Sequence, residues 1–181
     1  MEQEFTITAF SENSIGLLNR ITIIFTRRHL NIDSLTVSES AIQGIYKFTI
    51  VIRTTLDMIK KVVKQIEKIV DVIKAFYLNT SDIIHQEIAL YKVPTEALTA
   101  SNEIEQIVRI HNARILEVTQ DYTVVEKTGH KKETQELFEK LDKYGVLQFT
   151  RSGRIAITKM KTEMFTQFLK ALDKEHSASL K

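Results

Sequence analysis

The residues in this chain best suited to chemistry are two asparagines and a glycine, Asn13, Asn31 and Gly16. Each asparagine offers an amide oxygen that accepts a hydrogen bond from an ammonium group and an NH2 that donates to a carboxylate. A glycine, which has no Cβ, lets a ligand approach the backbone closely. Since an α-amino acid carries both an ammonium and a carboxylate, these residues together suit a free amino acid as ligand.

The polar turn that holds Asn13 and Gly16 is predicted to join a strand to a helix. Residues 5–10 alternate apolar and polar side chains like a half-buried strand, and residues 17–25 repeat apolar side chains at helical spacing. Backbone N–H groups in the first turn of a helix lack an intrahelical partner, and the helix dipole adds partial positive charge there. A carboxylate can therefore dock at this turn, while Asn31 begins the next strand.

Two segments resemble the opening of the acetolactate (acetohydroxyacid) synthase small subunit, a regulatory family. They are Glu12-Asn13-Ser14-Ile15-Gly16-Leu17-Leu18-Asn19-Arg20 and His29-Leu30-Asn31-Ile32-Asp33-Ser34-Leu35-Thr36-Val37. Shorter matches follow in the family's order, at residues 86–93, 115–119 and 151–153, so that the resemblance extends to about Lys159. It implies an N-terminal ACT domain with effector-binding residues Asn13, Ser14, Ile15, Gly16, Leu17, Leu18, Asn31 and Ile32.

The resemblance also implies a homodimer and a larger partner. The partner is the large catalytic subunit of acetolactate synthase, which carries thiamine diphosphate, magnesium and FAD and condenses pyruvate units on the way to branched-chain amino acids. The small subunit raises the partner's activity and confers feedback inhibition, usually by valine, and none of these cofactors is expected in this chain. In the family, two first domains pair so that the turn of one meets Asn31 of the other. Branched side chains suit a pocket edged by Ile15, Leu17 and Ile32.

The order of predicted elements is βαββαβ, and it occurs twice. This order is typical of the ferredoxin-like unit, so the sequence predicts an α+β fold of two ferredoxin-like domains, residues 1–80 and 81–181. Four turn-favouring residues at 79–82 form the expected linker. Apolar residues at 164–172 form a stripe on a C-terminal helix, which we expect the chain's own second sheet to cover, with a partner surface as the alternative.

Composition excludes several classes of function. The 25 Lys and Arg nearly balance the 23 Asp and Glu, so no general attraction to nucleic acid or membrane is expected. The chain has no cysteine, an N-terminus unlike a signal peptide, and no apolar run of the roughly 20 residues that a membrane helix needs. Its five histidines and five glycines form no zinc, dinucleotide or P-loop motif, and no serine lies in a nucleophile elbow. We therefore expect a cytoplasmic, non-catalytic protein without a metal.

Three alternatives remain open on the sequence alone. Gly16 and Asn31 also suit a helix start and a turn for purely local reasons. A stand-alone tandem amino-acid sensor that regulates gene expression through a protein partner would carry much the same site. A purely structural dimer module would bind no ligand at all.

Overall fold

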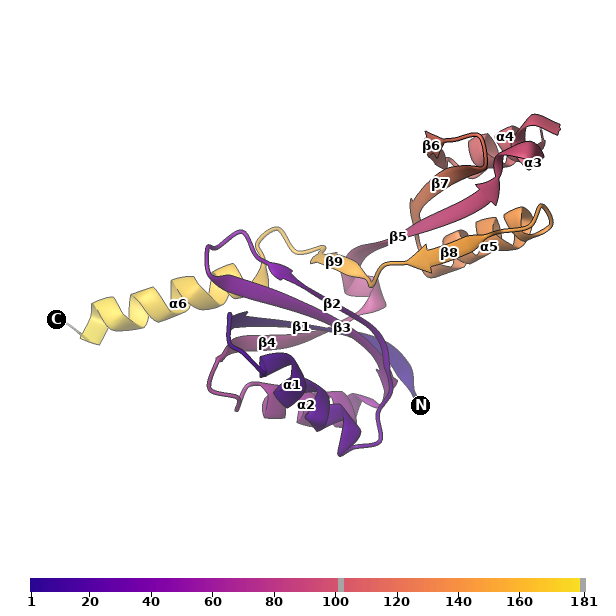
Figure 1. Ribbon diagram of the computed structural model, residues 1–181. Coiled ribbons are helices and arrows are strands. Elements are labelled where there is room, and N and C mark those ends of the chain that lie inside the picture. The colour runs from indigo at the N-terminus through magenta and orange to yellow at the C-terminus, as the bar shows by residue number, and fades with distance from the viewer. Residues whose placement is uncertain (101–102, 180–181) are drawn as a thin grey trace. The chain divides into compact units, whose positions relative to one another are not determined.

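The computed structural model describes residues 1–100 and 103–179. These residues form two compact units (Figure 1). The first unit combines Met1–Ile84 with the segment from Ala156 onward, and the second unit is His85–Ile155. The first part of the chain thus leaves the first unit at Ile84, four residues beyond the predicted domain boundary at residue 80.

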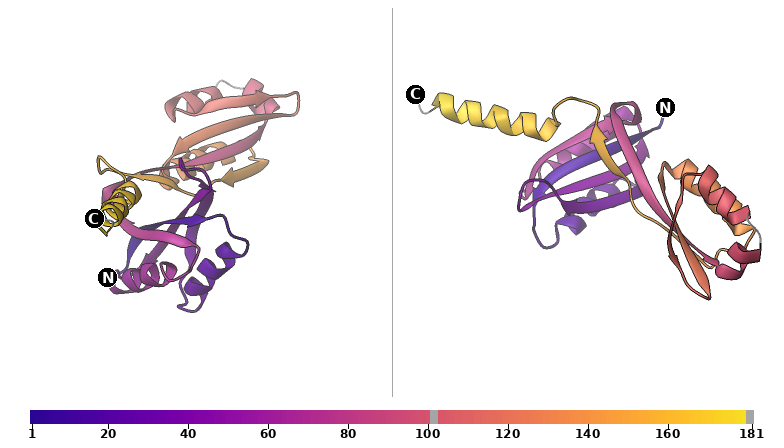
Figure 2. Two further views of the ribbon diagram at one scale, coloured as in Figure 1. Left: turned by 90° about the vertical axis from the view of Figure 1, so that its left-hand side faces the viewer. Right: turned by 90° about the horizontal axis from the view of Figure 1, so that it is seen from above.

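The first unit is built around a four-stranded antiparallel sheet in the order β2-β3-β1-β4. Its elements are β1 (Gln3–Glu12), α1 (Leu17–Thr26), β2 (Ile32–Glu39), β3 (Ile45–Thr54), α2 (Leu56–Ile66), β4 (Val72–Asn79) and the 3₁₀ turn η1 (Thr80–Asp82). Both helices cover one face of the sheet (Figure 1; Figure 2). The predicted linker at residues 79–82 is thus the last residue of β4 followed by the 3₁₀ turn η1.

Apolar residues at every second position of β1 form the centre of the first unit's core. Phe5, Ile7 and Ala9 of β1 have no solvent exposure and pack with apolar residues of α1 and α2. The start of α2 is fixed locally, since the Thr55 side chain accepts a hydrogen bond from the Met58 N–H at 3.4 Å. The predicted βαββαβ order is confirmed for this unit.

The second unit repeats the plan with a different sequence. Its elements are β5 (Ile83–Pro94), α3 (Thr95–Ala100), α4 (Glu103–Ile110), β6 (Arg114–Val118), β7 (Tyr122–Gly129), α5 (Lys131–Asp142) and β8 (Gln148–Arg151). The sheet order β6-β7-β5-β8 has the same pattern as in the first unit, and β9 (Ile155–Thr158) also pairs with β5. Pro94, which has no N–H to donate to a ladder, is the last residue of β5.

The C-terminal helix does not lie where the sequence suggested. α6 (Met164–Ser179) belongs to the first unit, not to a domain 81–181. Its Phe165, only 2 % exposed, stacks on Phe10 of β1 with ring centroids 4.0 Å apart, and Lys47 pairs with Glu163 at 3.2 Å. The physical reason is that the first sheet carries an apolar ring on the face opposite its helices, and this ring needs cover. The prediction that the second sheet covers the stripe is wrong.

Candidate functional site

The turn before α1 is exposed and holds Gly16 in the left-handed conformation. Gly16 has φ 78° and ψ 2°, a region that residues with a Cβ rarely adopt. Apart from Gly16 itself and its two neighbours in the chain, no described atom lies within 4 Å of the position that an added Cβ would take. Glycine therefore stands where the backbone needs it, with open space in front of it.

The N-terminus of α1 carries no built-in anion. Within α1, which the structure describes in full, the N-cap residue makes no side-chain hydrogen bond and the first turn contains no acidic residue. The Leu17 N–H donates to the Ser14 carbonyl oxygen at 3.2 Å, and the Leu18 and Asn19 N–H groups follow, where the helix itself supplies no acceptor. The positive end of the helix can therefore take a carboxylate from a ligand.

Most of the predicted effector residues are accessible. The exposed ones are Asn13, Ile15, Gly16, Leu18 and Asn31, and the half-buried ones are Ser14 and Ile32. Leu17 is the exception, because it is 2 % exposed and fills the core. It lies one helical turn before the buried Ile21, on the face that packs against the sheet. The expectation that the Leu17 side chain edges the pocket is therefore wrong.

The two asparagines are not brought together within one chain. Asn13 precedes α1 and Asn31 follows it, and a helix of 10 residues is about 15 Å long. One free amino acid cannot contact both side chains in a single chain. The N-terminal turn of α1 and the residue before β2 form one site only if they come from two chains.

A long-range ion pair holds the turn in place, and sequence reasoning missed it. Arg20 of α1 forms an ion pair with Asp71, just before β4, and donates to the Ser14 hydroxyl at 3.2 Å. The Glu12 N–H also donates to the Asp71 carbonyl oxygen at 3.0 Å. Asp71 thus anchors both sides of the turn. Since it lies 51 residues after Arg20, no local pattern indicates the contact.

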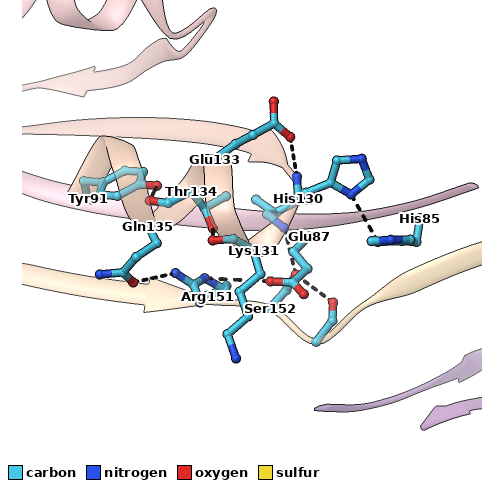
Figure 3. Close-up of polar contacts among 12 residues, drawn as sticks. His85, Glu87, Tyr91, His130, Lys131, Glu133, Thr134, Gln135, Arg151 and Ser152 are labelled. Carbon is cyan, nitrogen blue, oxygen red and sulfur yellow. Dashed lines mark hydrogen bonds and ion pairs between the residues drawn. The ribbon is translucent and has the colours of Figure 1, made fainter. Parts of the chain in front are cut away.

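The second unit contains a polar network between β5, α5 and β8 (Figure 3). The buried Tyr91 hydroxyl donates to the Thr134 carbonyl oxygen at 2.6 Å, and burial raises the pKa of Tyr91 to about 12. Arg151 lies 3.8 Å from the buried Glu87 carboxylate and donates to Gln135 at 3.1 Å. The network fixes α5 on the sheet.

Residues 151–153, which carry part of the family resemblance, lie at the end of β8 and contact β5. Ser152 accepts a hydrogen bond from the Ile88 N–H at 2.9 Å through its hydroxyl and donates its own N–H to the Ile88 carbonyl oxygen at 2.8 Å. Together with the Arg151 ion pair, these bonds attach the end of β8 to β5. Nearby, the ring nitrogens Nδ1 of His85 and His130 are 3.3 Å apart. These contacts join β8 and the start of α5 to β5.

The described ranges 1–100 and 103–179 contain no group of three or more His, Asp or Glu side chains arranged to hold a metal ion. In the same part of the chain, no helix is both long enough and apolar enough to cross a membrane.

Comparisons with known proteins match both units separately. A model of the "AHAS small subunit-like ACT domain" matches residues 7–74, and a model of the "small subunit of acetolactate synthase" matches residues 86–160. The acetolactate synthase small subunit of Bacillus subtilis is 33 % identical over 160 residues, which cover 88 % of this chain and 91 % of that protein. The chain belongs to the acetolactate synthase small-subunit family.

Further relatives agree with this assignment. The probable acetolactate synthase small subunit of Methanothermobacter thermautotrophicus is 33 % identical over 84 % of this chain and 91 % of its own length. The crystal structure of the acetolactate synthase small subunit from Thermotoga maritima superposes with a TM-score of 0.80 at 26 % identity, over 88 % of this chain and 99 % of that one.

Membership of the acetolactate synthase small-subunit family makes this chain a non-catalytic regulatory subunit and implies association with the large subunit. The ACT-domain match contains the Gly16 turn and Asn31. Both family models end before α6, which begins at Met164.

Proposed function

We propose that this chain activates the large catalytic subunit of acetolactate synthase and makes it sensitive to feedback inhibition by valine. The observation that carries the proposal is the open N-terminus of α1 at Gly16, within the region matched as an ACT domain. A regulatory subunit needs a site for the end product, and this site has the chemistry that an amino acid requires.

The ligand's carboxylate docks on the N–H groups of the first turn of α1, and its ammonium docks on the asparagine amide oxygens. Ile15, Leu18 and Ile32 leave apolar surface beside these polar groups. A small branched side chain covers that surface, which supports valine over longer or charged amino acids.

The site is shared between two chains paired along β2. This strand lies at the edge of the first sheet, and an edge strand leaves N–H and C=O groups free to pair with a second copy. A two-fold pairing brings the turn of one chain to Asn31 of the other. Such pairing removes the separation of about 15 Å that α1 imposes within one chain.

An effector bound at this seam favours one arrangement of the two first units over another. Feedback control requires this differential affinity, because a ligand shifts an equilibrium only by the difference in its binding to the two states. Thiamine diphosphate, magnesium and FAD bind to the large subunit, and copies of this chain contribute only the effector site. The cytoplasmic location remains a prediction.

The experiment assays acetolactate formation by the large subunit alone, by this chain alone, and by the mixture with and without valine. We expect no activity from this chain alone, higher turnover on mixing, and loss of that turnover as valine is added. Unchanged turnover on mixing at micromolar concentrations would refute the proposal. Valine binding without any effect on turnover would favour a stand-alone amino-acid sensor instead.

A further inference from the structure

The strand β6 is an exposed edge of the second unit's sheet (Figure 1). All five of its residues are exposed, which holds for no other strand in the described part of the chain. Three of them are apolar: Ile115 is 38 % exposed, Leu116 48 % and Val118 56 %. An edge strand with free backbone groups and exposed apolar side chains favours pairing with another strand.

The side chains of β6 are sorted by type between its two faces. Residues opposite each other in an antiparallel pair share a face of the sheet. Ile115 pairs with the buried Val125 on the helix-covered face, whereas Arg114 pairs with Glu126 on the other face. Glu117 also lies on that other face, opposite Val124, and Leu116 falls at the register shift between the two charged residues.

The order of these side chains is self-complementary. When β6 is laid antiparallel against its own copy with the two-fold axis midway between Ile115 and Leu116, Arg114 faces Glu117 of the second copy. In the same register Ile115 faces Leu116 of the second copy. Both charges meet an opposite charge and both apolar residues meet an apolar one, and the two-fold repeats each pair. A shift of one residue would place each charge opposite an apolar residue.

We propose that β6 is a self-association strand that pairs antiparallel with β6 of a second copy of this chain in this register. Arg114 already forms an ion pair with Glu126, and Tyr122 donates to Glu117 at 3.4 Å. Pairing therefore places Arg114 between two carboxylates on one face of the joined sheet. The opposite edge supports the choice, because β8 exposes the polar residues Gln148 and Thr150 instead. The proposal does not depend on the effector site.

The test uses disulfide cross-linking, which is clean because the chain contains no cysteine. Two full-length chains with different affinity tags carry Arg114→Cys and Glu117→Cys and are mixed with diamide as oxidant. Opposed residues in an antiparallel pair have Cα atoms about 4.5–5.5 Å apart, within the range of about 4.4–6.8 Å that a disulfide accepts. The mixed pair should cross-link, and it keeps one intact pair of Arg114 with Glu117.

Each single-cysteine chain serves as its own control. In the proposed register, two copies of Cys at position 114 are about 11 Å apart, three residues along the strand plus the strand spacing. Neither variant alone should therefore cross-link efficiently, and chains with Gln148→Cys and Thr150→Cys on β8 should not cross-link when mixed. Equal cross-linking of mixed and unmixed chains, or equal cross-linking at β8, would overturn the proposal. Cross-linking only to an added large subunit would also overturn it, since β6 would then bind that partner.

A second variant tests whether the apolar pair drives the contact. Leu116→Glu, added to both cysteine chains, places two carboxylates near the two-fold axis and removes two apolar contacts. We expect at least a tenfold slower formation of the mixed cross-link, with an unchanged circular dichroism spectrum because Leu116 is already 48 % exposed. An unchanged rate would show that β6 edges do not meet through these side chains.

Discussion

Substitution of Gly16 by aspartate should abolish the response to valine and leave activation of the large subunit largely intact. The new carboxylate would stand at the N-terminus of α1, where the effector's own carboxylate is proposed to bind. Since the space in front of Gly16 is open, the variant meets no steric clash. Its effect should therefore come from charge and backbone strain alone.

Backbone strain and charge repulsion both contribute to the effect of Gly16→Asp. An L-residue held at φ 78° costs roughly 1–2 kcal/mol of folding free energy. Two carboxylates about 5 Å apart repel by about 3 kcal/mol at an effective dielectric constant of about 20. That repulsion alone weakens valine binding by more than about a hundredfold. The melting temperature should fall by only a few degrees, because the strain is small beside the total stability.

The assay is a valine titration of acetolactate formation by the reconstituted enzyme, with calorimetry on the small subunit alone. Gly145→Asp is the matched control, because Gly145 has φ 82°, equal open space in the described structure and a position in the second unit. It should lose similar stability and keep the wild-type response to valine. Gly16→Ala separates the two effects, since alanine adds backbone strain without adding a charge.

Inhibition of Gly16→Asp by valine with the wild-type half-saturation would contradict a carboxylate site at Gly16. Loss of the valine response in Gly145→Asp to the same extent would also contradict it, because general destabilisation would then explain the result.

Three further outcomes follow from other contacts. Tyr91→Phe should make the free energy of unfolding depend less on pH at high pH. Because burial raises the pKa of Tyr91 to about 12, the neutral hydroxyl is stabilising below pH 10. That stability, up to about 3 kcal/mol, disappears as the pH rises from about 10 to 12. Denaturant unfolding of both proteins at pH 8 and 11 measures it, and equal losses would contradict it. Phe165→Ala should cost about 3 kcal/mol by removing the stack on Phe10, and thermal unfolding without a shift would contradict the position of α6. Asn31→Ala should weaken valine binding about ten- to hundredfold in calorimetry without changing the melting temperature, and unchanged affinity would contradict its role.

The fold was predictable where a local pattern decides the structure. The apolar–polar alternation of residues 5–10 and the helical spacing of apolar residues at 17–25 and 164–172 gave β1, α1 and α6 at their correct places in the sequence. The repeated βαββαβ order followed from patterns of this kind. Bounds were less predictable: the expected domain boundary at residue 80 falls at the start of η1, whereas the second unit begins at His85, within β5.

The position of α6 could not be predicted because an apolar stripe does not say which surface it covers. Phe165 packs on Phe10, which lies 155 positions earlier in the chain. The same limit applies to the ion pairs Arg20–Asp71 and Arg151–Glu87, each of which joins separate elements. Residue types indicate that such charges need partners, but only the three-dimensional fold selects them.

The candidate site was predictable in part. Turn chemistry and helix polarity predicted an open helix N-terminus at Gly16, and the structure has one. The Leu17 side chain lies in the core, on the same face of α1 as Ile21. The spacing of four residues between the two could have indicated this. Asn31 follows α1 and lies away from the Gly16 turn, so it completes the proposed site only from a second chain.

The most direct measurement mixes two damaged chains, Asn13→Ala and Asn31→Ala, and titrates the tag-purified heterodimer with valine by calorimetry. A site shared across the two-fold places Asn13 of one chain beside Asn31 of the other. One pocket of the heterodimer then regains both asparagines, while the second pocket loses both. We expect about half the wild-type number of high-affinity valine sites in the heterodimer and none in either homodimer. A heterodimer without any high-affinity site would contradict the shared effector site.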